Sequence, residues 1–142
     1  MTTPEIAPQR DRWLRAIGYG LLAEIATIFT IVAVVLLYRY VVARDLSDAD
    51  YVAFAERVGA WLGVIGGTLY VYFFAHRLTR LLASRFVAHG IVVAVAAIAL
   101  SIGGSLAGHQ GIPPLYGLAS ALKLAAGGFA GYLASRRAHR TS

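Results

Sequence analysis

The sequence contains neither cysteine nor asparagine, and each absence excludes a class of site. Without cysteine there is no disulfide, no thiolate metal ligand, no thiol nucleophile and no palmitoylation. Without asparagine there is no acceptor for N-glycosylation. The serines have no histidine and carboxylate partner at a suitable position, so hydrolase chemistry has no support. We therefore predict a protein that is not an enzyme and that has no metal site.

Charge is also scarce in this chain of 142 residues. Only 14% of the residues are charged, 58% are hydrophobic, and the mean hydropathy is +0.66. These values depart from those of soluble domains, so a bilayer is the expected solvent. The net charge of +6 comes from basic residues at the ends of apolar runs. Lipid headgroups are then the nearest anions, and no nucleic-acid partner is predicted.

Four apolar runs dominate the sequence, at approximately 16–40, 56–76, 86–108 and 112–135. Runs of roughly 17 to 25 residues cross the hydrocarbon core as helices, and four spans are too few for a closed barrel. We predict an all-α integral membrane protein, a four-transmembrane-helix bundle over residues 13–137. Residues 1–12 are predicted to be a disordered cytoplasmic tail and residues 138–142 a basic cytoplasmic tail.

The arginines are distributed unequally between the two ends of these spans. The first loop has Arg39, Arg44 and Arg57, offset by Asp45, Asp48, Asp50 and Glu56. Nine others fall in the N-terminal segment, the second loop and the C-terminal tail: Arg10, Arg12, Arg15, Arg77, Arg80, Arg85, Arg136, Arg137 and Arg140. The positive-inside rule predicts an N-in, C-in topology, and we expect a bacterial cytoplasmic membrane. The last six of these arginines are predicted to contact anionic lipid headgroups.

Glycines recur at helical spacing within the spans. The members of this pattern are Gly59, Gly63, Gly66 and Gly67 in the second span, Gly104 and Gly108 in the third, and Gly127 and Gly131 in the fourth. Small residues four apart let membrane helices approach closely, so these positions predict glycine-rich helix interfaces. The same faces could serve packing within one chain or a homo-oligomer, and we favour packing within the chain.

Two opposite charges lie inside the apolar runs, Glu24 in the first and Lys123 in the last. Each stands on the small-residue side of its helix, so both are expected to face the bundle interior. One interpretation is an ion pair that links the first span to the fourth; the other is a carboxylate that binds protons or substrate. Measured along straight helices, the two charges differ in depth, so the sequence leaves direct pairing open.

The stretch Gly20-Leu21-Leu22-Ala23-Glu24-Ile25 resembles the first helix of small multidrug resistance transporters. The single membrane glutamate of that family binds protons and cationic drugs, which the resemblance implies for Glu24. The chain departs from the family in its acidic first loop, its N-terminal extension and a third span without the family's tryptophan-centred glycine pattern. Lys123 would also oppose the binding of a cation.

His76 closes the second span and His89 opens the third, at comparable depth. Two histidines on neighbouring helices are what a b-type haem requires, so haem stays an alternative to the expectation of no cofactor. We expect a non-enzymatic multi-pass protein that serves as an accessory or interaction subunit with other membrane subunits. The alternative is a small oligomeric transporter or channel, coupled to protons or cations, that uses Glu24.

Overall fold

The computed structural model describes residues 9–43, 46–108 and 114–140, and within these ranges the only regular structure is helical. Four α-helices follow one another along the chain, and a short π-helical segment, η1, extends the first. Their bounds are α1 (Gln9–Leu37), η1 (Tyr38–Val42), α2 (Asp48–Thr79), α3 (Phe86–Ala107) and α4 (Tyr116–Ala138). The prediction of an all-α fold with four long helices is confirmed for the described residues.

Three of the helices, α1 with η1, α2 and α3, are long and apolar enough to cross a membrane. The fourth, α4, has a comparable length but is less apolar, because glycines, serines and Lys123 replace larger apolar side chains along it. The finding is consistent with an integral membrane protein.

The helix bounds differ from the predicted spans at several ends. The helix α1 begins at Gln9, so residues 9–12 of the predicted tail are helical, while residues 1–8 lie outside the described part of the chain. The helix α2 begins two turns before the predicted span, because Ser47 caps it in a reciprocal pair with Asp50. The predicted fourth span began at 112, whereas α4 begins at Tyr116, and 109–113 are not described.

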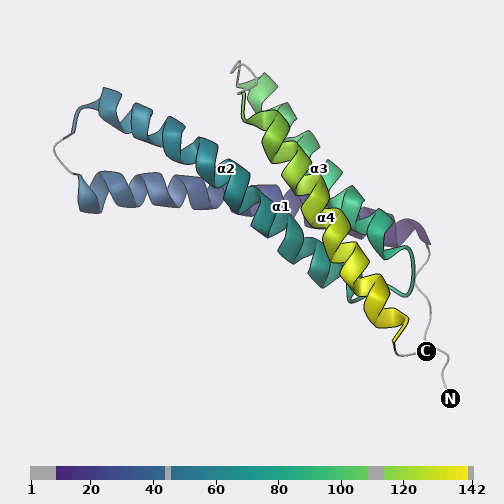
Figure 1. The fold of residues 1–142 in the computed structure, drawn as a ribbon. Coiled ribbons are helices and arrows are strands. Elements are labelled where there is room, and N and C mark those ends of the chain that lie inside the picture. The colour runs from purple at the N-terminus through teal and green to yellow at the C-terminus, as the bar shows by residue number, and fades with distance from the viewer. Residues whose placement is uncertain (1–8, 44–45, 109–113, 141–142) are drawn as a thin grey trace.

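The four helices form two antiparallel hairpins, α1–α2 and α3–α4, that cross each other (Figure 1). The start of α1, the connection between α2 and α3 and the end of α4 lie at one end of the molecule. Around the crossing, α1 packs on α3 and α2 packs on α4, whereas α1 and α4 lie on a diagonal and their backbones hardly touch. Toward the other end the hairpins diverge, so the molecule has the shape of a fork.

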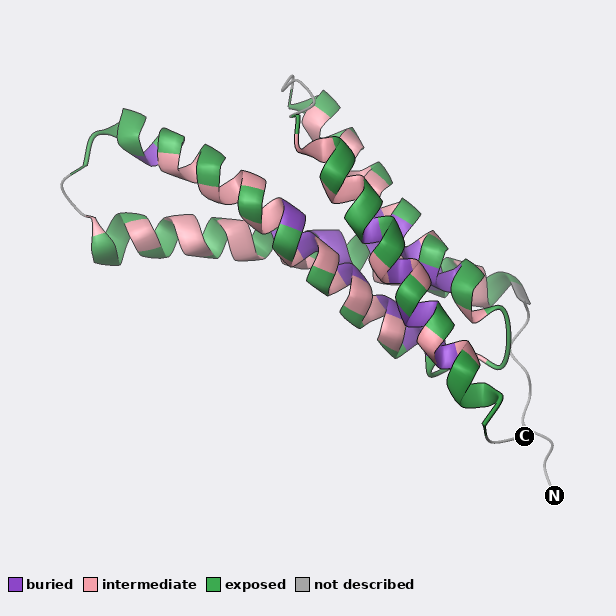
Figure 2. Ribbon diagram, in the orientation of Figure 1, coloured by how far each residue is buried: buried purple, intermediate pink, exposed green. Residues whose placement is uncertain are grey.

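Burial divides the molecule into two halves (Figure 2). We call the region with α1 up to Thr27, α2 from Gly67, α3 up to Ser101 and α4 from Lys123 the packed half, and the remainder the open half. Apart from Tyr51 and Val64, every described buried residue lies in the packed half. The core there is built largely from alanine, with Val71, Leu78 and Val93 as the largest fully buried apolar side chains.

Backbone contact between α3 and α4 explains the small core residues. A Cβ at Gly90 would overlap the carbonyl oxygen of Gly127, and a Cβ at Gly127 would overlap that of Gly90. At Gly131, an added Cβ would lie 2.5 Å from the carbonyl oxygen of Phe86. Likewise on the α1–α3 side, Gly20 has no room for a Cβ against Val93. Such close approach replaces the hydrophobic driving force that is missing between helices in lipid.

Candidate functional site

The two charges within the apolar runs, Glu24 and Lys123, meet at the point where the hairpins begin to diverge. Lys123 Nζ donates a hydrogen bond to Glu24 Oε2 over 2.6 Å, and the two groups form a salt bridge. Ser101 Oγ of α3 donates to the other carboxylate oxygen, Oε1, also over 2.6 Å. Both oxygens of Glu24 are therefore satisfied by side chains from two other helices.

The residues around this ion pair use their own polar groups locally and leave space for the lysine. On α1, Thr27 Oγ1 donates a hydrogen bond to the carbonyl of Ala23, so this hydroxyl does not compete for Glu24, one turn away. On α2, Gly67 lies against the lysine stem: a Cβ there would be 2.7 Å from Lys123 Cε. The absence of a side chain at Gly67 lets the lysine pass across α2 and reach the diagonal helix α1.

The ion pair is almost completely buried within the protein, since the side chains of Lys123 and Glu24 are only 4% and 6% exposed. Burying two charges is costly unless their geometry is good and their remaining polar atoms are satisfied. The short contact and the hydrogen bond from Ser101 meet much of that requirement. All four helices contribute, through Glu24, Gly67, Ser101 and Lys123, so the pair connects the two hairpins across their diagonal.

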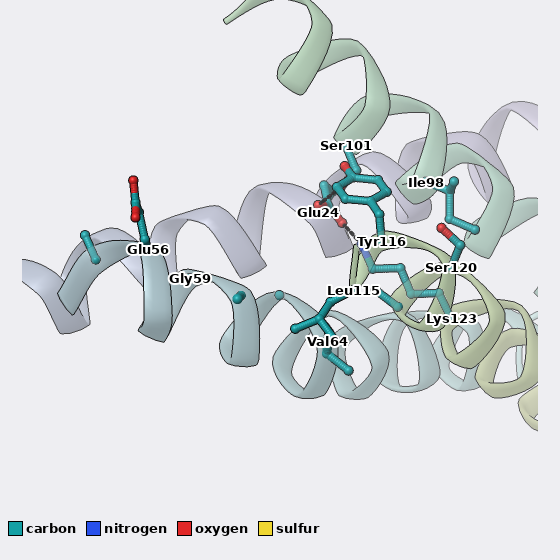
Figure 3. Close-up of a pocket in the computed structure, with 14 residues that line it drawn as sticks. Glu24, Glu56, Gly59, Val64, Ile98, Ser101, Leu115, Tyr116, Ser120 and Lys123 are labelled. Atoms are coloured by element: carbon teal, nitrogen blue, oxygen red, sulfur yellow. Dashed lines mark hydrogen bonds and ion pairs between the residues drawn. The ribbon is translucent and has the colours of Figure 1, made fainter. Parts of the chain in front are cut away.

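A cavity of about 690 Å³ lies in the fork directly beside the ion pair (Figure 3). One wall is the inner face of α2, where Gly59, Ala60 and Gly63 leave a smooth surface; Ala55, Glu56 and Val64 complete it. The opposite wall comes from α3 and α4, through Ile98, Ser101, Leu115, Tyr116, Ala119 and Ser120, and both charged residues also line the cavity. The cavity thus combines apolar walls with a small polar region near the ion pair.

The predicted glycine positions separate into two groups. Gly67, Gly127 and Gly131 are buried and lie where a Cβ would meet another helix at close range. At Gly63, Gly66 and Gly104, an added Cβ would meet nothing within 4 Å, and at Gly59 it would make only an ordinary contact with Ile31. Gly108 is the exposed C-cap of α3. The described residues of this chain show no close helix approach at Gly59, Gly63, Gly66 and Gly104, so the role of these glycines in a helix interface stays a prediction.

The arginines predicted to contact lipid headgroups are all exposed, and they lie at the end of the molecule formed by the α2–α3 connection and the end of α4 (Figure 1). They are Arg77, Arg80, Arg85, Arg136, Arg137 and Arg140. Arg85 has a left-handed backbone conformation, with φ of 55°, immediately before α3. On the opposite end, Arg39 pairs with Asp48 over 3.3 Å, whereas Arg44 and Asp45 lie outside the described residues.

The two histidines considered for haem occupy the packed half. His89 is buried; its Nδ1 lies 2.9 Å from the carbonyl oxygen of Arg85, and its ring stacks on Trp13 with centroids 4.2 Å apart. The ring of His76 stacks on that of Tyr72, with centroids 5.8 Å apart. Neither histidine lines the cavity in the fork. Among the described residues, each has one buried nitrogen without a hydrogen-bond partner, Nδ1 of His76 and Nε2 of His89.

Several residues of this site were not identified from the sequence. Ser101 has only a weak sequence feature, a hydroxyl on a strongly apolar helix. Gly20 and Gly90 lie in apolar runs as small residues, like the glycines predicted to form helix interfaces. The contacts at the tip of the α1–α2 hairpin were also not predicted. The rings of Tyr38 and Phe54 stack with centroids 3.6 Å apart, and the Tyr51 hydroxyl donates a hydrogen bond to the carbonyl of Ala43. These contacts hold α1 and α2 together beyond the packed half.

Comparisons with known protein families, curated proteins and solved structures find no match to this chain. What the fold and the site define is a helical protein with three helices apolar enough to span a membrane and a buried ion pair at the junction of two hairpins.

Proposed function

We propose that this chain is a non-enzymatic multi-pass membrane protein that acts as an accessory or interaction subunit of a membrane complex. The observation that carries the proposal is the outer part of the α1–α2 hairpin, residues 28–42 and 48–64, which we call the arm. Beyond Thr27, the hydrogen bonds described for Thr30 are with α2 and with the backbone of α1, and the described ring contacts of Tyr38 in η1 are with α2. The arm therefore presents helix faces that α3 and α4 leave uncovered.

Large apolar side chains on the arm are well exposed, among them Leu36, Val42, Val52 and Trp61. Lipid can cover part of such a surface, so exposure alone does not require a protein partner. The segment Arg10–Val42, however, has 33 residues and is about 50 Å long at 1.5 Å per residue. It exceeds the hydrocarbon thickness of roughly 30 Å, so the arm must tilt or extend beyond the core. A neighbouring subunit would support a helix pair in either arrangement.

The same proposal includes four transmembrane helices, N-in and C-in, in a bacterial cytoplasmic membrane. The fourth crossing is supported by the neutralisation of Lys123, since a paired charge lowers the cost of placing α4 in lipid. The orientation is supported by the exposed arginines at the end of the molecule where α1 begins and α4 ends. A periplasmic reporter fused after Ser142 should give no signal, and strong activity would contradict this topology.

The interaction role is tested with single cysteines, because the native chain has none to interfere. Leu36→Cys on the arm and Val95→Cys on the packed half are matched, at 47% and 50% exposure of the native residues. With a photoactivated crosslinker in native membranes, Leu36→Cys should give a discrete protein adduct, either a partner or a second copy. Val95→Cys should give only lipid adducts. Equal behaviour of the two variants would contradict the role of the arm.

A second candidate, a small oligomeric transporter or channel using Glu24, is favoured by one observation: Glu24 lines the cavity in the fork. Against it, both carboxylate oxygens are already paired. Liposomes containing the protein, with a pH gradient and a cationic dye, distinguish the candidates. Dye or proton movement that Glu24→Gln abolishes, in a variant that remains folded, would favour the transporter. Equal passive leak with and without the protein favours the interaction subunit.

A further inference from the structure

The cavity in the fork has hydrogen-bond donors that the fold does not use. Tyr116, Ser120 and Lys123 line it from α4, at spacings of four and three residues that place them on one helix face. Within the described part of the chain, the ammonium of Lys123 donates one hydrogen bond, to Glu24, out of three it can make. The hydroxyls of Tyr116 and Ser120 make none there. Three polar side chains on this wall thus have hydrogen-bond donors that are unused within the described residues.

The charge at the base of the cavity limits what these donors can bind. Glu24 and Lys123 neutralise each other at 2.6 Å, so a second anion beside Lys123 would also lie close to the carboxylate. A cation would face the ammonium and find both oxygens of Glu24 already in use. Glu56 on the α2 wall adds a further negative charge that disfavours anions. A neutral group that accepts hydrogen bonds fits this environment without breaking the ion pair.

The α2 wall of the cavity faces these donors and sets the shape of the apolar part of a ligand. A Cβ at Gly63 would meet nothing within 4 Å, and one at Gly59 would meet only Ile31 Cγ2 at 3.8 Å, so this face of α2 is smooth. The other wall residues are mainly alanine, valine, leucine and isoleucine. The volume of about 690 Å³ is within the range of small-molecule sites, roughly 300–1,000 Å³.

We infer that the cavity in the fork binds a neutral, lipid-soluble carbonyl compound, whose carbonyl oxygens accept hydrogen bonds from Lys123, Ser120 and Tyr116 and whose apolar body lies against Gly59 and Gly63. A carbonyl of this kind occurs in a glyceride ester and in a quinone, and both share the chemistry that the site recognises. The inference is independent of the interaction role of the arm.

The test uses the full-length protein purified in detergent and native mass spectrometry with added probes. Dioleoylglycerol represents the ester and decylubiquinone the quinone, while oleate and hexadecyltrimethylammonium are the anionic and cationic comparators. Saturable binding of either neutral probe, exceeding that of both comparators, is expected, and the probe that binds identifies the source. Failure of both neutral probes to bind saturably, or stronger binding of a comparator, would overturn the inference.

Matched variants locate the binding. Gly63→Leu places a side chain in the cavity and should weaken binding of the neutral probe by about tenfold or more, a change that mass titration resolves. Gly66→Leu is the control, since Gly66 has the same open surroundings but does not line the cavity, and its affinity should stay within about twofold. Ser120→Ala should weaken binding by about threefold to tenfold through loss of one donor. Equal affinity in the wild type, Gly63→Leu and Ser120→Ala would place the probe elsewhere and overturn the inference.

Discussion

The packed half and the open half are both rich in glycine, yet their glycines do different things. In the packed half, five glycines have no room for a Cβ: Gly20, Gly67, Gly90, Gly127 and Gly131. In the open half, Gly59, Gly63, Gly66 and Gly104 face free space or an ordinary contact. The spacing of small residues therefore shows which helix faces can accept a close neighbour. The tertiary structure decides which of these faces has one.

The ion pair marks the boundary between the halves, and breaking it should have the largest effect. Glu24→Gln or Lys123→Met alone leaves a buried charge without its partner, and each should lower the free energy of unfolding by about 3 to 5 kcal/mol. The double variant removes both charges and should cost much less than the sum of the singles. Chemical denaturation in detergent micelles measures the cycle. Additive effects would show that the two residues do not act as a pair.

The α3–α4 contact tests the packed half itself. Gly90→Ala and Gly127→Ala each force a methyl group into the carbonyl oxygen of the other helix, so the helices must separate. We expect each variant to lose about 1 to 3 kcal/mol of stability, measured as a lower thermal midpoint. Gly104→Ala on α3 is the control, because its Cβ meets nothing within 4 Å, and it should be neutral or slightly stabilising. If all three variants unfold alike, the difference between the halves is not one of packing.

Two serines that line the cavity, Ser101 and Ser120, provide a comparison of similar size across the boundary. Ser101 donates to the buried carboxylate of Glu24, so Ser101→Ala should cost about 1.5 to 3 kcal/mol, as expected for a hydrogen bond to a charged group. Ser120 makes no hydrogen bond within the described residues, and Ser120→Ala should change the free energy of unfolding by less than about 0.5 kcal/mol. A Ser120→Ala variant as unstable as Ser101→Ala would mean that the cavity wall is part of the packed core.

The sequence predicts the helices better than their arrangement, for physical reasons that particular residues show. Long apolar runs can satisfy their backbone in lipid only as helices, which is why all four were located. The helix α2 begins earlier than the apolar run predicts, because the Ser47–Asp50 capping box starts it in a polar segment. Straight, upright helices would place Glu24 and Lys123 at different depths, so the sequence alone does not predict their direct pairing. The hairpins instead cross, and Gly67 lets the lysine stem pass between them. The divergence that creates the cavity has no local sequence signal, since it depends on where close packing stops.

Gly63 and Gly67 give the smallest and most direct test, because one helical turn separates them on α2 and they belong to different halves. A Cβ at Gly67 would lie 2.7 Å from Lys123 Cε and 3.3 Å from its Nζ, so Gly67→Ala must displace the end of a flexible side chain that is held in the ion pair. Since the lysine can move, the cost should be only about 1 kcal/mol. At Gly63 the new methyl meets nothing within 4 Å, so Gly63→Ala should stabilise the protein by up to about 1 kcal/mol through the higher helix propensity of alanine. The same substitution is thus expected to have opposite signs at positions four residues apart, and thermal unfolding of the two variants in the same detergent measures both. The Glu24→Gln/Lys123→Met background provides the control. There Lys123 is replaced by a methionine that no ion pair holds, so the penalty at Gly67 should shrink while the effect at Gly63 stays unchanged. Equal penalties at Gly67 in both backgrounds would show that the glycine is required by the backbone of α2 and not by the passage of Lys123.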